Sequence, residues 1–302
     1  MSHVATLIAD PASSALDAAT AERARAALSG AGAVDWLDAR VAADIPFTLT
    51  EPGVERQRAA VAHLLGLLGG RPVDVVIQPL AHRRKRLFLA DMDSTMIGQE
   101  CIDELADHVG LKAHVAAITE RAMRGEIAFV PALRERVALL KGLSAAVVDE
   151  VVARRITLTP GARTLIATMR RHGTYTCLVS GGFTLFTGKI AAMIGFDENR
   201  ANTLVVEGGA LSGFVTEPVL GSEAKLASLH ELRSRLGLTP HDTMAVGDGA
   251  NDLPMIAEAG LGVAYHGKPV VAEAAAARID HGDLTALLYL QGYRRSEFVV
   301  PQ

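Results

Sequence analysis

Three short apolar runs stand out in the second part of the chain, at residues 87–90, 175–179 and 243–246, and helical patterns separate them. Such runs, bounded by polar or glycine residues, are typical of parallel strands that are buried on both faces. The pattern therefore predicts an α/β unit with a Rossmann-like parallel sheet over residues 81–302.

The first 80 residues follow a different pattern, in which apolar strands and helices alternate over short distances. We expect strands at 3–9, within 34–49 and at 73–77, and helices at about 13–28, capped by Ser13 or Ser14, and at 54–68. This order predicts a small α+β domain over residues 1–80, with helices on one face of an antiparallel sheet. It contains no convergent set of catalytic residues.

The segment between the first two apolar runs is too long for a single crossover helix. Apolar residues recur at helical spacing through about residues 99–156, which predicts an inserted helical cap over the site. Two apolar runs within 202–216 flank Gly208-Gly209 and predict a hairpin.

Composition narrows the functional classes. The chain has 302 residues, 21% charged residues and a net charge of -4, which argues against nucleic-acid binding. No apolar run reaches the length of a membrane span, and residues 1–10 lack the features of a signal peptide, so we expect a cytoplasmic enzyme without a membrane partner. Cys101 and Cys177 give no disulfide framework. The basic cluster at 82–86 is interpreted as a solvated linker.

The polar residues that follow the apolar runs are the place to look for function, because ligands bind beyond the carboxyl ends of parallel strands. Asp91 and Asp93 follow the first run, and side-chain alternation lets both face one site. Asp91 could attack a phosphorus atom as a nucleophile, while Asp93 could protonate the leaving oxygen. An Asp-x-Asp alone is weak evidence, since it often forms a turn or a helix cap.

The second run ends in Ser180-Gly181-Gly182, whose hydroxyl and backbone N–H groups could donate to phosphate oxygens. Such a triplet is usually a simple turn. Lys225 lies between the second and third runs and could neutralise both a phosphate group and Asp91. A lone lysine is normally solvated, so its role depends on the rest of the set.

The third run ends in the segment 247–252, which reads Gly-Asp-Gly-Ala-Asn-Asp. Asp248, Asp91 and the backbone carbonyl of Asp93 form a sparse oxygen set that suits Mg²⁺. Asn251 and Asp252 could support this set with polar contacts, or could instead cap the next helix.

These motifs, in this order, resemble the haloacid-dehalogenase superfamily of aspartate-based phosphatases, over about residues 86–290. The resemblance implies a phosphoaspartyl intermediate on Asp91, with Asp93 as acid and base. It also implies phosphate binding by Ser180, Gly181, Lys225 and Asn251, and Mg²⁺ held by Asp91, Asp93 and Asp248 beside Asp252. An acid at position 93 argues against dehalogenase chemistry, in which no alkoxide leaves.

A narrower resemblance is to the phosphoserine phosphatases, in which the cap binds an amino acid. It implies that Glu100 accepts the substrate ammonium and that Arg136 pairs with its carboxylate. It further implies that Met123 and Phe129 line the pocket, and that residues 1–80 form a divergent ACT-like domain. The expected reaction is Mg²⁺-dependent hydrolysis of O-phospho-L-serine, the last step of serine biosynthesis.

Two alternatives stay open from sequence. One is a related phosphatase or phosphotransferase that acts on another small phosphomonoester or on homoserine. The other is a non-catalytic amino-acid sensor, against which the presence of both Asp91 and Asp93 argues. The sequence also leaves open whether the chain forms a homodimer and whether residues 1–80 bind an effector.

Overall fold

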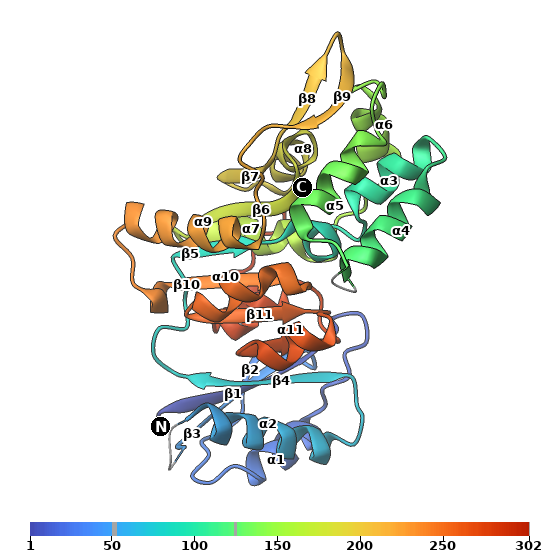
Figure 1. The fold of residues 1–302 in the computed structure, drawn as a ribbon. Helices are drawn as coiled ribbons and strands as arrows, with labels where there is room; N and C mark the ends of the chain where they lie inside the picture. Colours follow the sequence, from blue (N-terminus) through green and yellow to red (C-terminus); the bar gives the residue numbers. More distant parts are fainter. Residues whose placement is uncertain (50–52, 124–125, 302) are drawn as a thin grey trace.

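The computed structural model describes residues 1–49, 53–123 and 126–301. Two sheets organise this part of the chain, one from the N-terminal residues and one from the residues after Leu87, with a group of helices above the second sheet (Figure 1). None of the helices in these ranges combines the length and the apolar character needed to span a bilayer.

The N-terminal sheet is antiparallel and has the strand order β2-β3-β1-β4. Its elements are β1 His3–Ala9, α1 Ala18–Ala26, β2 Asp35–Asp38, β3 Ala42–Phe47, α2 Val54–Leu68 and β4 Val73–Pro79. The helices cover one face, where Leu7 and Leu64 share a core, whereas Ile8 faces the core of the second sheet. The predicted α+β pattern is therefore present. The serine cap is wrong, because the side chain of Asp17 accepts the capping hydrogen bond from Thr20.

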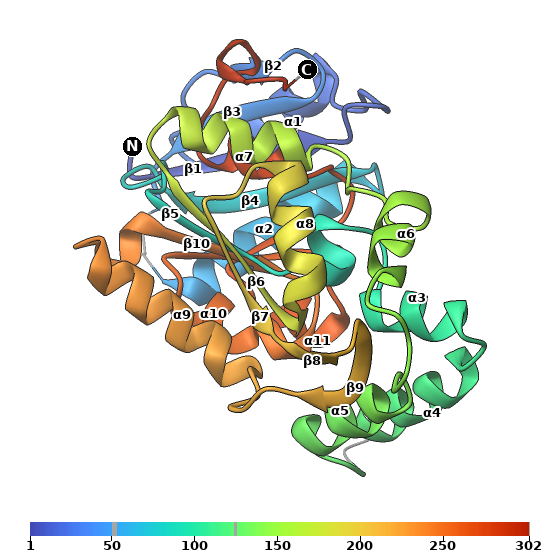
Figure 2. The ribbon, with the colours of Figure 1, turned by 90° about the horizontal axis from the view of Figure 1, so that it is seen from above.

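Six strands of the described chain form the predicted parallel sheet, in the order β12-β11-β10-β5-β6-β7. They are β5 Leu87–Ala90, β6 Tyr175–Phe183, β7 Glu198–Asn202, β10 Thr243–Gly247, β11 Leu261–Tyr265 and β12 Ala277–Ile279. Helices cover both faces (Figure 2): α7 Ala162–Arg171, α8 Thr184–Ile194 and α12 Ala286–Leu290 on one, and α9 Ser222–Arg235, α10 Leu253–Glu258 and α11 Pro269–Ala274 on the other. This two-sided burial explains why β5 is apolar at every position: Phe88 packs toward α7 and α8, whereas Leu87 and Leu89 pack toward α9 and α10.

The predicted helical insertion is present as α3 Cys101–His108, α4 Lys112–Met123, α5 Phe129–Ala138 and α6 Val147–Arg154. The predicted hairpin consists of β8 Leu204–Glu207 and β9 Ala210–Val215. It extends the helical group, since the N–H of Leu211 donates to the carbonyl of Leu143, and that of Ala145 to the carbonyl of Gly209.

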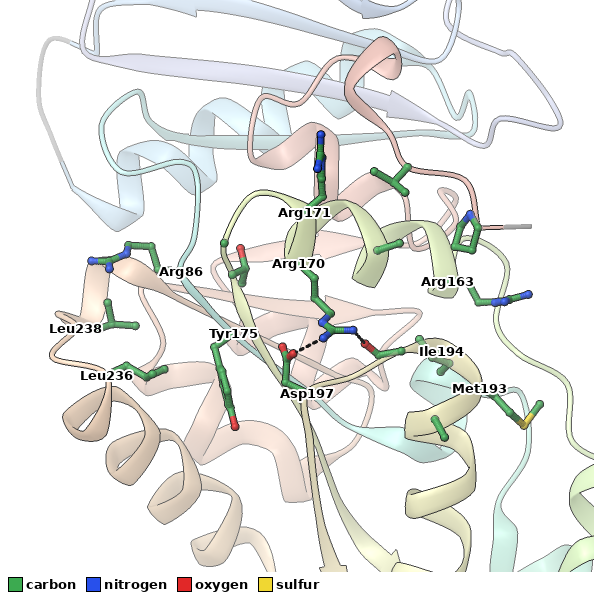
Figure 3. A pocket seen from close by; sticks show the side chains of 17 residues that line it. Arg86, Arg163, Arg170, Arg171, Tyr175, Met193, Ile194, Asp197, Leu236 and Leu238 are labelled. Atoms are coloured by element: carbon green, nitrogen blue, oxygen red, sulfur yellow. Dashed lines mark hydrogen bonds and ion pairs between the residues drawn. The ribbon is translucent and has the colours of Figure 1, made fainter.

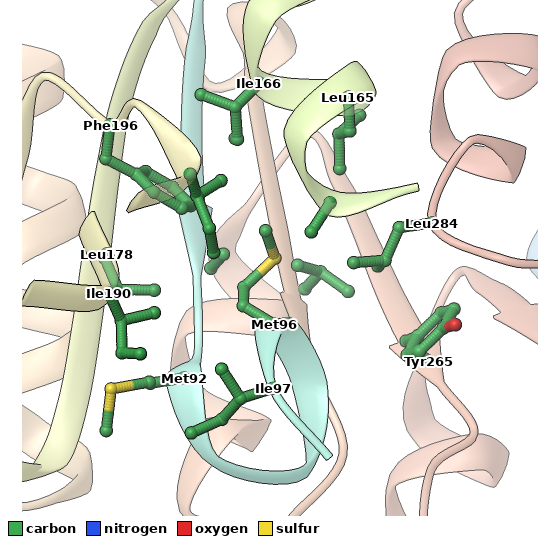
Figure 4. Packing of buried hydrophobic residues seen from close by; sticks show 14 of the residues in the cluster. Met92, Met96, Ile97, Leu165, Ile166, Leu178, Ile190, Phe196, Tyr265 and Leu284 are labelled. Carbon is green, nitrogen blue, oxygen red and sulfur yellow. The ribbon is translucent and has the colours of Figure 1, made fainter. Parts of the chain in front are cut away.

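The turn that follows β5 is anchored by apolar side chains. Met92, Met96 and Ile97 are fully buried in the main core, together with Leu165 and Leu178 (Figure 4). This packing fixes the backbone of the turn that carries the predicted catalytic acids.

The basic cluster at 82–86 forms the predicted solvated linker only in part: His82, Arg84 and Arg86 are exposed, whereas Arg83 and Lys85 are not. Arg83 makes an ion pair of 2.6 Å with Asp44 of the N-terminal sheet, and also donates to the carbonyls of Tyr289 and Leu290. Lys85 is 6% exposed, and its Nζ donates to the carbonyl of His241. Arg83 is therefore part of the contact between the two sheets, whereas Lys85 is buried against the loop that precedes β10.

Burial lowers the pKa of Lys85 to about 8. The ordinary lysine value is about 10.4, so between these values the unfolded chain binds more protons and the folded state gains stability as the pH rises. We therefore expect the unfolding free energy of the wild type, relative to Lys85→Met, to increase from pH 8 to pH 10 in urea titrations. A difference that does not vary over this range would show that Lys85 titrates normally.

Candidate active site

Asp91 and Asp93 lie on the anchored turn beyond β5. Asp91 is 5% exposed, and its Oδ1 accepts from the N–H of Met92 at 2.8 Å. The Oδ1 of Asp93 accepts from the N–H of Cys101 at 3.1 Å, at the start of α3. The turn therefore connects the end of the central strand to the first helix of the insertion.

Ser180, Gly181 and Gly182 lie beside this turn, near the end of β6. The hydroxyl of Ser180 accepts from the N–H of Gly182 at 2.9 Å, which leaves its own proton for donation. A Cβ at Gly182 would lie 3.0 Å from the Ser180 hydroxyl and 3.2 Å from Asp93 Oδ2. Glycine at this position thus allows the two strand ends to approach each other closely.

Lys225 joins two of the acids below the pocket floor. It is 2% exposed, and its Nζ lies 2.6 Å from both Asp91 Oδ1 and Asp252 Oδ1. The second oxygen of Asp252 accepts from the N–H of Gly249 at 3.1 Å. Asp252 therefore uses both oxygens to hold Lys225 and the loop after β10.

Several acids of the site are buried together, and this burial shifts their pKa values. Burial, reinforced by Asp252, raises the pKa of Asp91 well above its ordinary value, and Lys225 opposes this change. Burial and the nearby charge of Glu100 raise the pKa of Asp93 to about 7. Burial alone would lower the pKa of Lys225, but Asp91 and Asp252 raise it. Lys225 thus stays charged, while Asp93 can exchange a proton near neutral pH.

Asp91, Asp248 and Asp252 could hold a cation, since each offers an oxygen and these oxygens lie within 4.8 Å of one another. Burial raises the pKa of Asp248 too, as expected for carboxylates that lack a full complement of counter-charge. The donor set is made only of oxygens, which suits a hard divalent cation. Asp252 uses both oxygens in short contacts with Lys225 and Gly249, whereas Asp91 uses only Oδ1 in this way and the contacts of Asp248 are longer, at 3.4 and 3.5 Å. Asp91 and Asp248 are therefore better placed to bind a cation.

These groups open into a pocket of about 300 Å³ between the strand ends and the helical insertion. Predicted site residues lining it are Asp91, Asp93, Glu100, Phe129, Arg136, Ser180, Gly181, Asp248 and Asn251. Lys225 and Asp252 lie beneath it. Met123 ends α4, and its side chain lies outside the part that the structure describes.

The insertion contributes opposite charges to this pocket. Glu100 accepts from the hydroxyl of Ser94 at 2.7 Å, and Ser94 adopts the left-handed φ of 54° that the turn requires. Arg136 donates to Ala132 O and to Thr119 Oγ1, and within the described residues it has no ion-pair partner. The ring of Phe129 comes within 3.4 Å of a Cβ placed on Gly181, so the insertion reaches the strand ends.

The structure adds pocket residues that the sequence analysis missed. Lys268 follows β11, and its Nζ lies 3.4 Å from Asp248 Oδ2. Thr119 and Leu133 of the insertion also line the pocket. Asn202 lies just outside it, where its side-chain amide donates to the carbonyls of Gly181 and Leu220. Lys268 could have been found as a polar residue after an apolar run, had 261–265 been recognised as a strand.

A larger hollow of about 820 Å³ lies at the opposite, amino-terminal ends of β5 and β6 (Figure 3). Arg170 pairs there with Asp197 at 2.7 Å and donates to the carbonyl of Gly195. None of the predicted site residues lines this hollow, so the smaller pocket is the candidate active site.

Comparisons with known proteins point to the same chemistry. The model of the haloacid dehalogenase-like hydrolases matches residues 88–257. A phosphoserine phosphatase of Polaromonas sp. is 48% identical over 226 residues, which are 73% of this chain and 96% of that protein. The crystal structure of a HAD family hydrolase from Salmonella enterica serovar Typhi has a TM-score of 0.85 and 29% identity, covering 96% of this chain and 98% of that chain. A phospho-aspartyl intermediate analogue of phosphoserine phosphatase has a TM-score of 0.63 and 40% identity, covering 68% of this chain and 98% of that chain.

Proposed function

This chain belongs to the haloacid dehalogenase-like hydrolases, and from that premise we propose that it hydrolyses O-phospho-L-serine to L-serine and phosphate. One observation carries the substrate assignment: a paired acid motif and two oppositely charged side chains, Glu100 and Arg136, line the same small pocket. The relatives named phosphoserine phosphatase support the same substrate. The product would be the end point of serine biosynthesis.

In the proposed first step, an oxygen of Asp91 forms a bond to phosphorus and the seryl oxygen leaves. Asp93 donates its proton to that oxygen, a role that suits a carboxyl group whose pKa is raised to about 7. In the second step Asp93 removes a proton from water, which attacks phosphorus and releases the Asp91 carboxylate. Proton and phosphoryl group are thus each transferred twice, and both acids return to their starting states.

The remaining strand-end groups would bind the phosphoryl oxygens. The hydroxyl of Ser180 is available as a donor, and Lys225 places a buried positive charge beside Asp91. Gly181 allows close approach, and Asn251 lines the opposite side of the pocket. We propose that Asp91, Asp248 and the backbone carbonyl of Asp93 hold Mg²⁺, which when bound neutralises part of the phosphate charge.

Glu100 would accept the substrate ammonium, and Arg136 would pair with its carboxylate. Arg136 makes no ion pair within the described residues, although the charges of Asp103 and Glu100 act on it, so its guanidinium can take up a substrate carboxylate. Phe129 lies over Gly181 and would limit the entry of water. Met123 would complete this apolar wall.

We propose two domains, an ACT-like domain over residues 1–80 and a phosphatase domain over 81–302 whose cap spans about 99–156. Cytoplasmic location and a homodimer remain predictions. Membership of a hydrolase family, with Asp91 and Asp93 both in the pocket, disfavours the non-catalytic sensor.

The direct test is phosphate release from O-phospho-L-serine with Mg²⁺, beside O-phospho-L-threonine and phosphoglycolate. We expect a strong preference for phosphoserine that is lost on chelation. Equal turnover of all three compounds would retain the aspartate chemistry and reject the amino-acid assignment. Adding homoserine tests the phosphotransferase alternative, since transfer would yield phosphohomoserine instead of free phosphate.

Glu100→Gln and Arg136→Gln should each raise the KM for phosphoserine by about tenfold to a hundredfold, the usual cost of one hydrogen bond to a charged group. The kcat/KM for phosphoglycolate, which lacks an ammonium group, should not fall in Glu100→Gln. Glu135→Gln, an exposed neighbour on α5 that pairs with Arg121, is the matched control. If Glu100→Gln and Arg136→Gln keep the wild-type KM for phosphoserine, as Glu135→Gln should, the substrate assignment is wrong.

A further inference from the structure

A buried acid of the N-terminal sheet binds the loop that follows β12. Asp74, on β4, is 4% exposed. Its carboxylate accepts from three successive backbone N–H groups, those of Asp280 at 2.8 Å, His281 at 3.2 Å and Gly282 at 2.8 Å. A carboxylate that satisfies three backbone donors fixes their positions closely, because each donor is costly to leave unpaired.

The same loop holds a second loop, which follows β11. The Nε2 of His266 lies 3.1 Å from the carbonyl of Gly282, and since a carbonyl only accepts, Nε2 is the donor. The backbone N–H of His266 donates to the carbonyl of Ile279 at 2.8 Å. His266 has a φ of 45°, which residues other than glycine rarely adopt, so these two hydrogen bonds stabilise a strained backbone.

Two residues further on, this second loop reaches the pocket. The N–H of Lys268 donates to the carbonyl of Asp248 at 2.9 Å, and its Nζ lies 3.4 Å from Asp248 Oδ2. Lys268 lines the pocket, and its side chain is half exposed there. A continuous series of contacts therefore runs from Asp74 through Gly282 and His266 to an ammonium group at the active site.

We propose that Lys268 is a phosphate-binding residue of this pocket and that Asp74 is a positioning residue, through which the N-terminal sheet sets the place of Lys268. The phosphate-binding part rests on the proposed function. The positioning part rests only on the contacts between the loops. Removing the N-terminal sheet contact would release the second loop and weaken phosphate binding without changing any residue in the pocket.

Asp74→Asn tests this proposal, because the amide replaces one acceptor oxygen by a donor that faces backbone N–H groups. Amide hydrogen exchange at residues 264–268 should become at least about tenfold faster. The Kd for inorganic phosphate, measured by calorimetry with Mg²⁺, should rise by about two- to thirtyfold. Lys268→Met should weaken phosphate binding as well, and adding Asp74→Asn to it should cause no further loss.

Asp44→Asn is the matched control. Asp44 is a buried acid of the same sheet, but it binds Arg83 and Thr6 instead of the loop at 280–282. Equal acceleration of exchange at 264–268 in both variants would reduce Asp74 to a general interface contact and overturn its positioning role. A loss of phosphate affinity that persists fully in the Lys268→Met background would overturn the route through Lys268.

His266→Asn gives a second, independent test if Asp74→Asn does not fold. Asparagine tolerates the left-handed φ but is too short to reach the carbonyl of Gly282. It should accelerate exchange at 264–268 in the same way, and unchanged exchange would overturn the proposal. If the wild type does not hydrolyse phosphoserine, the proposed function fails, whereas the exchange experiment still decides the role of Asp74.

Discussion

Asp91→Asn should lower phosphate release from phosphoserine by about 10⁴-fold or more, as expected when a covalent nucleophile is removed. The amide retains the shape of the side chain but cannot form an acyl phosphate. Folding should be little affected, because Lys225 keeps Asp252 as its partner at 2.6 Å. Steady-state kinetics and thermal unfolding of the same preparation measure both effects.

The matched control for this variant is Asp197→Asn. Asp197 pairs with Arg170 at the opposite ends of the strands, and its change should leave kcat and KM close to those of the wild type. Phosphate release by Asp91→Asn at more than a few per cent of the wild-type rate would refute the role of Asp91 as nucleophile.

Lys225→Met should have the second largest effect, because it leaves two buried carboxylates without their shared cation. Breaking a buried ion pair in this way costs about 3–5 kcal/mol of unfolding free energy. The loss of a preorganised charge beside the phosphoryl group should lower kcat by about 10²–10³-fold. Urea denaturation and kinetics at saturating Mg²⁺ measure the two effects separately.

The same variant makes a more specific prediction about the cation. With Lys225 absent, bound Mg²⁺ would supply the positive charge beside Asp91 and Asp252 that the lysine supplies in the wild type, so it should raise the unfolding midpoint more than it does in the wild type. Lys112→Met, on the first turn of α4, serves as the control. Equal stabilisation by Mg²⁺ in the wild type and Lys225→Met would show that the lysine does not balance these acids.

Much of the fold could be predicted because local patterns and burial agree. The strand at 87–90 is apolar at every position since helices cover both of its faces. β7 was missed for the opposite reason: its sequence Glu-Asn-Arg-Ala-Asn carries polar side chains that are satisfied by ion pairs, such as Glu198 with Arg235. β11 and β12 were also absent from the prediction.

The site could be predicted in outline because parallel strands end at the same edge of a sheet. Asp91, Ser180 and Asp248 are far apart in sequence, yet all three line one pocket. Interactions between the two sheets could not be predicted. Arg83 pairs with Asp44 of the N-terminal sheet, a distant partner that no local pattern reveals. The same holds within the second unit for Lys85, whose partner is the carbonyl of His241.

The most direct test of the central claim is to trap the intermediate. The wild type would be mixed with O-phospho-L-serine and Mg²⁺, quenched rapidly and reduced with borohydride, which converts an aspartyl phosphate to homoserine. Peptide mass spectrometry should then find homoserine at position 91 and unmodified Asp93. Rapid phosphate release without any conversion of Asp91, or with conversion at another acid, would contradict the account.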